Sequence, residues 1–135
     1  MKLHREKIPP HIPMNKIYRS DAEAQEQRIE EAWGSLNWLA GKGLHNSENL
    51  TLGRVVIKPG HFNPKHSHPN CDEVLYLLKG KLMHVIGDQT YIMEPGDTTL
   101  APANVSHLAF SIGEENADMI VAYSSGTREL KEEED

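Results

Sequence analysis

Residues 60–80 read GHFNPKHSHPNCDEVLYLLKG, and this stretch holds the residues that decide the fold and the chemistry. Its central feature is the pair His66 and His68. Side chains two positions apart on a strand point to the same face, so the two imidazoles can converge on one metal ion. Glu73 begins the apolar run that follows, where its carboxylate could complete the ligand set. A His-x-His pair alone is weak evidence for a metal site, so the prediction depends on the spacing of the surrounding residues.

After residue 50 the chain has the pattern of an all-β domain. Short runs rich in Val, Ile, Leu, Thr and Tyr are separated by turns that contain Gly, Pro, Asn or Asp. Many short strands with frequent turn signals are typical of a β-sandwich or a β-barrel. The expected strands are Leu50–Ile57, Glu73–Leu78, Lys81–Ile86, Thr90–Met93, Thr98–Ala101, His107–Ser111 and Ala117–Tyr123.

The residues around the histidine pair follow a fixed spacing. Intervals of five, one, four and six residues separate the members of the series Gly60, His66, His68, Glu73 and Gly80. This series resembles the first signature of the cupin superfamily with no departure.

A second series lies further along the chain. Intervals of five, one, two and three residues separate Gly96, Pro102, Asn104, His107 and Ser111. This series resembles the second cupin signature, except that Asn104 replaces the usual glycine and Ser111 replaces a frequent asparagine. Asparagine tolerates a positive φ better than most residues, so we expect Asn104 to make the same turn. At Ser111 we expect the loss of one internal hydrogen bond. The resemblance covers about residues 50–125.

The resemblance implies an all-β fold, a double-stranded β-helix or jelly-roll barrel of roughly six to eight strands with one metal ion in its mouth. Carried over residue by residue, the ligands are His66, His68, Glu73 and His107. Imidazole and carboxylate ligands suit one divalent transition metal ion per chain: Fe, Mn, Ni, Co or Zn. Four protein ligands leave an octahedral ion open positions for water, substrate or dioxygen, as in catalytic sites. The alternative is a polar barrel mouth without a metal.

Strand alternation predicts which other side chains line the barrel. If Glu73 faces inward, then His84 and Tyr123 on later strands also face inward. His84 could act as a general acid or base. It could instead be a hydrogen-bonded core residue, or face outward after a register shift of one. Tyr123 could donate a hydrogen bond to a substrate or only pack. Arg54 is expected to face outward, and the mostly apolar lining suits a small organic molecule.

Length and composition indicate one domain without nucleic-acid or membrane partners. The chain has 135 residues and a formal net charge of −6, with no basic stripe and interleaved aromatic residues. The single cysteine, Cys71, excludes an internal disulfide and favours a reducing cytoplasm. Cys71 could supply a thiol ligand, but this alternative is not favoured, because the pattern already provides four ligands. Neither a signal peptide nor a run of about 20 apolar residues is expected.

We divide the domain into residues 1–45, an N-terminal arm and helix, residues 46–126, the barrel, and residues 127–135, an acidic tail expected to be disordered. Three prolines in residues 1–19 disfavour helix and central strand, so an extended arm is expected there.

One surface helix is expected over about residues 21–33. Ser20 and Glu23 fit a capping box, and Gly34 supplies a stop. The apolar cluster that follows is expected to cover one end of the barrel, the alternative being a subunit contact or a substrate lid. This cluster is Trp33, Leu36, Trp38 and Leu39. His61, which precedes the metal loop, is expected to face solvent, and no role is assigned to His4, His11 and His45.

Several functions fit these residues. We favour a metal-dependent enzyme acting on a small oxygenated organic molecule by metal-assisted proton transfer, giving isomerase, lyase or cyclase chemistry. One alternative is an Fe(II)-dependent dioxygenase. Others are a small-ligand-binding cupin without turnover and a metal-free structural protein, because a fold alone does not separate these classes. The resemblance implies a homodimer joined through barrel faces with N-terminal segments exchanged, and the proline-rich arm fits such an exchange.

Overall fold

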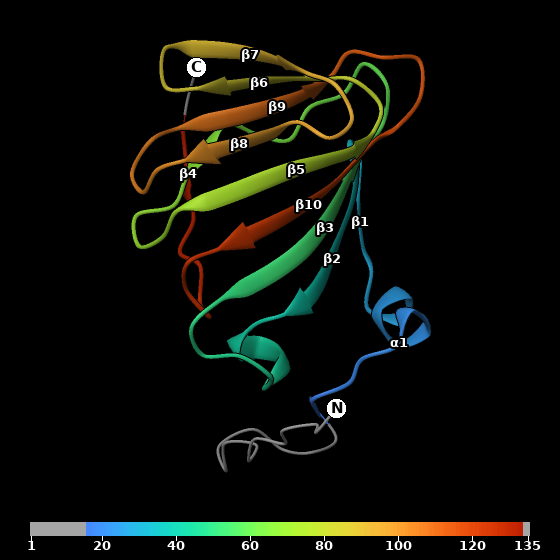
Figure 1. Ribbon diagram of the computed structural model, residues 1–135, viewed down its shortest axis with the longest axis vertical. Coiled ribbons are helices and arrows are strands. Elements are labelled where there is room, and N and C mark those ends of the chain that lie inside the picture. Colours follow the sequence, from blue (N-terminus) through green and yellow to red (C-terminus); the bar gives the residue numbers. More distant parts are fainter. Residues whose placement is uncertain (1–15, 134–135) are drawn as a thin grey trace, which may run out of the picture.

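The computed structural model describes residues 16–133 as two antiparallel β-sheets with one short α-helix beside them (Figure 1). One sheet has the strand order β1-β2-β3-β10-β5-β8, and the other has the order β11-β4-β9-β6-β7. The elements are α1 (Asp21–Glu26), β1 (Ile29–Glu31), β2 (Gly34–Ala40), η2 (Lys42–Leu44), β3 (Thr51–Ile57), β4 (His66–Ser67), β5 (Glu73–Lys79), β6 (Leu82–Ile86), β7 (Gln89–Met93), β8 (Thr98–Ala101), β9 (His107–Ser111), β10 (Ala117–Tyr123) and β11 (Lys131–Glu132).

The core lies between the two sheets and is formed by alternate residues of each strand. Along β3, β5, β6 and β10, buried and more exposed residues alternate for most of the length, as the sequence pattern predicts. Leu77 and Leu82 are fully buried, and Met119 is 1% exposed. Removing such a side chain from water stabilises the fold by about 1.5–3 kcal/mol. Burial on one face therefore sets the register that positions the site.

Strand pairing brings the polar residues of interest to neighbouring positions. His66 of β4 pairs with His107 of β9, and Glu73 of β5 pairs with Tyr123 of β10. His84 of β6 pairs with Ala109 of β9, two positions from His107 and on the same face. The two sheets thus direct these side chains into the space between them.

The turn before β9 confirms the prediction for Asn104, which has a φ of 68°. Its backbone N–H donates to the carbonyl oxygen of His68 at 3.0 Å, so the turn also holds the histidine loop. Ser111 is fully buried, and its hydroxyl has no hydrogen-bond partner among the described residues. The expected loss of a hydrogen bond at this position agrees with that finding.

The helix is shorter than expected. Ser20 caps it as predicted, accepting a hydrogen bond from the N–H of Glu23 at 3.1 Å, but α1 ends at Glu26 instead of continuing to about residue 33. The following residues form the β1–β2 hairpin, and β2 pairs with β3. Pairing with an available sheet edge outweighs helix propensity here. Gly34 begins β2, where a Cβ atom would collide with the carbonyl oxygen of Val56.

The chain also has more strands than the expected six to eight, and its tail is more ordered than expected. Eleven strands are present among the described residues, because β1 and β2 extend one sheet and the short strands β4 and β11 extend the other. Residues 131–132, placed in a disordered tail by composition, pair with His66 and Ser67. The all-β, two-sheet architecture is confirmed.

Residues 1–15, most of the expected arm, lie outside the described part, and the domain boundaries stay a prediction. No helix in residues 16–133 is long and apolar enough to cross a bilayer.

Candidate metal centre

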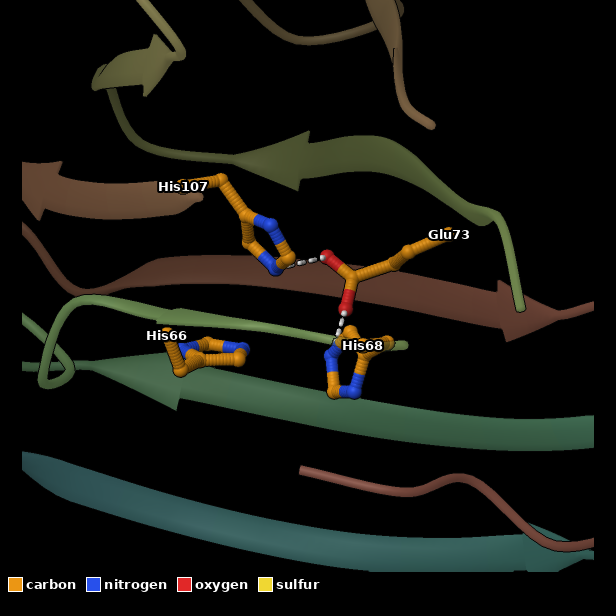
Figure 2. Close-up of side chains that lie close together, drawn as sticks. All are labelled: His66, His68, Glu73 and His107. Atoms are coloured by element: carbon orange, nitrogen blue, oxygen red, sulfur yellow. Dashed lines mark ion pairs between the residues drawn. The ribbon is translucent and has the colours of Figure 1, made fainter. Parts of the chain in front are cut away.

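Four buried side chains meet between the sheets (Figure 2). His66 comes from β4, His68 follows it, and Glu73 and His107 are the first residues of β5 and β9. One nitrogen or oxygen atom from each residue lies within 4.8 Å of the others. The structure therefore brings together all four residues that the sequence motif selected, in a group that could hold a metal ion.

A backbone carbonyl orients each imidazole. The Nδ1 atoms of His66, His68 and His107 contact the carbonyl oxygens of Pro64, Glu129 and Val105 at 2.7, 2.7 and 3.2 Å, respectively. A carbonyl oxygen only accepts, so each Nδ1 carries the proton and donates it. Each Nε2 is then left with a lone pair, which is the arrangement that second-sphere partners impose on metal-binding histidines.

The Glu73 carboxylate lies between two of these imidazoles, as Figure 2 shows. Its Oε1 atom is 3.3 Å from Nε2 of His68, and its Oε2 atom is 3.5 Å from Nε2 of His107. Neither Nε2 atom has a hydrogen-bond partner in the described structure, although both are buried. Carboxylate oxygens and imidazole lone pairs repel at these distances unless a cation lies between them. A proton or a metal ion satisfies that requirement.

The titration behaviour of the group agrees with this need for a cation. Burial raises the pKa of Glu73, but contacts with His107 and His68 outweigh it and hold the pKa well below 4.5. Burial lowers the pKa of His107, yet the Glu73 carboxylate more than offsets this effect and raises the pKa above 6.5. Burial and the charge of His107 lower the pKa of His66 to about 4. The buried Glu73 carboxylate therefore favours a positive charge on His107, whereas His66 is neutral near pH 7.

Three imidazole nitrogens and one carboxylate fit a divalent first-row transition metal ion. Burial and fixed tautomers reduce the reorganisation needed for binding. Cys71 is also buried, but it is not part of the group, and burial raises the pKa of its thiol.

The group opens onto a cavity of about 110 Å³ between the sheets. Its lining is mostly apolar, with side chains from β2, β3, β5, β6, β9 and β10 and from the C-terminal segment. Both sequence-predicted pocket residues, His84 and Tyr123, line it. Such a cavity takes a small organic molecule whose few polar groups meet a few polar side chains.

His84 lines this cavity, and one of its two ring nitrogens has no hydrogen-bond partner among the described residues. Its Nδ1 atom lies 2.8 Å from Oγ1 of Thr99, and that hydroxyl in turn donates towards Sδ of Met93 at 3.7 Å. Thr99 is therefore available to accept the Nδ1 proton of His84. The Nε2 atom of His84 is buried without a partner among the described residues. Burial lowers the pKa of His84 to about 4, so the imidazole is neutral near pH 7.

Tyr123 lies beside the metal group. Its ring centroid is 5.0 Å from that of His68. Burial, together with the nearby Glu73 carboxylate, raises the pKa of Tyr123 well above 10, so its hydroxyl keeps its proton and can donate it in a hydrogen bond. The structure places both candidate catalytic residues at the cavity but does not assign their roles.

One cavity residue, Arg128, was not anticipated from the sequence. Arg128 stacks on Trp38, and both line the cavity. Three members of the apolar cluster, Trp33, Leu36 and Trp38, pack against the core and line the cavity. Reading residues 34–40 as a strand would have placed Leu36 and Trp38 on one face. No local signal marked Arg128, which stands in a polar tail.

Arg54 lies outside the cavity lining and pairs with Asp118 across the outer face of the sheet, as its parity predicted.

Comparison with known proteins agrees with this geometry. The family model of the cupin domain matches residues 53–123, more than half of the chain. The chain belongs to the cupin family. Among curated proteins, this cupin is 32% identical over 88 residues to oxalate oxidase GF-2.8 of Triticum aestivum and to oxalate oxidase 2 of Hordeum vulgare. It is equally similar to germin-like protein 3-5 of Oryza sativa subsp. japonica. These matches cover 59% of this cupin but 39% of each relative.

Solved structures show the same fold. The cupin superposes on oxalate decarboxylase from Bacillus subtilis with a TM-score of 0.75, at 22% identity over 82% of this chain and 30% of that one. For the oxalate decarboxylase of Lactobacillus farciminis the TM-score is 0.73, at 19% identity over 78% of this chain and 33% of that one. The chain spans only a part of the length of all these proteins.

Proposed function

We propose that this cupin is a metal-dependent enzyme that acts on a small oxygenated organic molecule by metal-assisted proton transfer, as an isomerase, lyase or cyclase. The observation that carries the proposal is the common cavity. It is lined by His66, Glu73 and His107 of the buried group and by His84, whose Nε2 atom has no partner among the described residues. A bound divalent metal ion, with Fe, Mn, Ni, Co or Zn as candidates, would polarise a carbonyl or enediolate oxygen of the substrate.

The side chains supply the proton-transfer part of the reaction. His84 accepts a proton at Nε2, because its Nδ1 proton is already shared with Thr99 and its ring is neutral near pH 7. Tyr123 keeps its proton and donates a hydrogen bond to a substrate oxygen. The apolar lining excludes water around both groups, which strengthens each polar interaction with the substrate.

A second candidate is oxidation with dioxygen at a redox-active metal. Its support is the 32% identity to proteins named oxalate oxidase, limited to 39% of their length. The two candidates differ in a measurable way. Proton transfer next to a carbonyl exchanges a substrate C–H for deuterium without consuming oxygen, whereas an oxidase depletes oxygen.

The test combines metal analysis, oxygen uptake and solvent isotope exchange. Purified protein is analysed for metal by mass spectrometry and then screened with oxalate and with small hydroxy and keto acids in deuterated buffer. The proposal is supported if both His66→Ala and His84→Gln lose deuterium incorporation into the substrate. Of these two variants, only His84→Gln should still contain the metal. Metal-dependent oxygen uptake that persists in His84→Gln overturns it in favour of the oxidase. Ligand binding without turnover of any substrate overturns it in favour of a binding protein.

We also propose a cytoplasmic homodimer. The single cysteine is consistent with a reducing compartment. The outer face of β5 exposes Val74, Tyr76 and Leu78, with Leu100 of β8 beside them in the same sheet. Contiguous apolar side chains of this kind often mark a protein interface.

A further inference from the structure

Arg128 has an unusual environment for a cation in a small cavity. Its Cζ atom lies 4.3 Å from the ring centroid of Trp38 and 5.6 Å from that of Tyr123. Both rings belong to the cavity lining. Stacking on an aromatic face holds a guanidinium by its plane, while its N–H groups stay available at the edge.

Those N–H groups have no partner in the described part of the chain. In residues 16–133, Arg128 makes no ion pair and no side-chain hydrogen bond, whereas Arg54 binds both carboxylate oxygens of Asp118, at 2.9 and 2.6 Å. Glu132 lines the same cavity, but it does not pair with Arg128. The planar fork of an arginine matches a carboxylate, so an oriented and unpaired guanidinium in a cavity is suited to a ligand carboxylate.

We propose that Arg128, held by Trp38, is a specificity-determining residue that binds a carboxylate group of the substrate. The inference rests on the proposed function, since it assumes that the cavity takes a substrate at the metal group. Tyr123 lies between the two sites, because it contacts both Arg128 and His68. The ligand class is therefore a short organic acid, with an oxygen directed at the metal group and a carboxylate at Arg128.

This subsite belongs to parts of the chain outside the family match. Trp38 comes from β2 and Arg128 from the C-terminal segment, and both lie outside residues 53–123. Gly53 of β3 allows the tryptophan to lie close to the sheet, because a Cβ atom there would come within 2.6 Å of the Trp38 ring. The barrel thus supplies the metal group, and the additional segments supply the recognition of the ligand.

The test uses Trp38 as a local reporter. In a Trp33→Phe background Trp38 is the remaining tryptophan, so its emission reports binding next to Arg128. The probes are acetate, malonate and succinate, each paired with its neutral amide, and the titrations use manganese-loaded and metal-free protein. At least one acid should bind more tightly than its amide. Arg128→Gln should weaken its binding about 10- to 100-fold, with a smaller loss in Arg128→Lys.

A matched variant and a metal assay make the result decisive. Arg28→Gln removes the same charge from a residue that lies outside the cavity lining and pairs with Glu30, so it should not weaken acid binding. Equal affinities of the parent and the Arg128→Gln protein, or no preference for any acid over its amide, would overturn the inference. Failure to bind any of Fe, Mn, Ni, Co or Zn would instead overturn the proposed function, while the metal-free titrations would still decide the role of Arg128.

Discussion

The backbone carbonyl oxygen of Glu129 accepts a hydrogen bond of 2.7 Å from Nδ1 of His68, a residue 61 positions earlier in the chain. The same C-terminal segment pairs with β4 through residues 131–132, and Ser67 donates to the Glu133 carboxylate at 3.0 Å. A segment with the composition of an acidic tail therefore orients one member of the metal group.

Deleting residues 129–135 should weaken metal binding about 10- to 100-fold, because the His68 ring loses the acceptor that fixes its tautomer and orientation. Competition with a coloured chelator measures the affinity. Deletion of residues 134–135 alone is the matched control and should leave the affinity unchanged. Equal metal affinities of the two truncated proteins would contradict this role of the segment.

A metal ion should stabilise the folded protein, because it separates the Glu73 oxygens from the imidazole lone pairs that face them. At a free metal concentration 100 times Kd, the gain in free energy of unfolding is about 2.7 kcal/mol, and Tm rises by roughly 10 °C. The Glu73→Gln variant keeps the shape of the side chain and removes its charge, so its Tm should respond much less. Thermal unfolding with and without metal makes the comparison. The same rise in Tm for both proteins would mean that the metal binds elsewhere.

Acid should destabilise the metal-free protein partly through His84. Burial lowers its pKa from 6.5 to about 4, so between these values the unfolded chain binds a proton that the folded protein does not. The stability associated with neutral His84 is complete above pH 6.5 and is lost as the pH falls towards 4. Between pH 7 and 4.5, His84→Gln should lose about 2–3 kcal/mol less free energy of unfolding than the wild type. Urea titrations at both pH values measure it, and identical losses would show that His84 is not the responsible group.

Gly53→Ala should displace the Trp38 ring and destabilise the protein by about 1–3 kcal/mol, because the new Cβ atom would overlap two ring atoms. Gly43→Ala is the control, since a Cβ atom there meets nothing within 4 Å. Thermal unfolding and Trp38 emission are the measurements. An unchanged emission spectrum in Gly53→Ala would show that the ring does not depend on this glycine.

Tyr76→Glu should dissociate the proposed homodimer, because it places a charge in the exposed apolar face of β5. Tyr91→Glu makes the same change at an equally exposed tyrosine of the other sheet and should leave the assembly intact. Light scattering after gel filtration gives the mass of each, and removal of residues 1–19 tests the contribution of the arm. A wild-type protein that elutes as a monomer would exclude the dimer.

Much of the metal group could be predicted because its pattern is local. The His66 and His68 side chains share a face through strand periodicity alone, and the inward parity of His84 and Tyr123 follows from the same alternation. The positive φ of Asn104 could be predicted because asparagine adopts this backbone conformation more readily than most residues, which is a property of the single residue. The cupin signatures then connected these local patterns with the distant His107.

Other features depend on neighbours that are remote in the chain. The segment after Glu26 became a hairpin rather than helix because β3 offered it an edge, which its own helix formers do not reveal. The tail that orients His68, and the stacking of Arg128 on Trp38, arise only when the sheets have closed. Periodicity over a few residues is a property of the local backbone and can be seen in the sequence. The contact of a tail arginine with a tryptophan near the other end of the chain is a property of packing, and only the tertiary structure decided it.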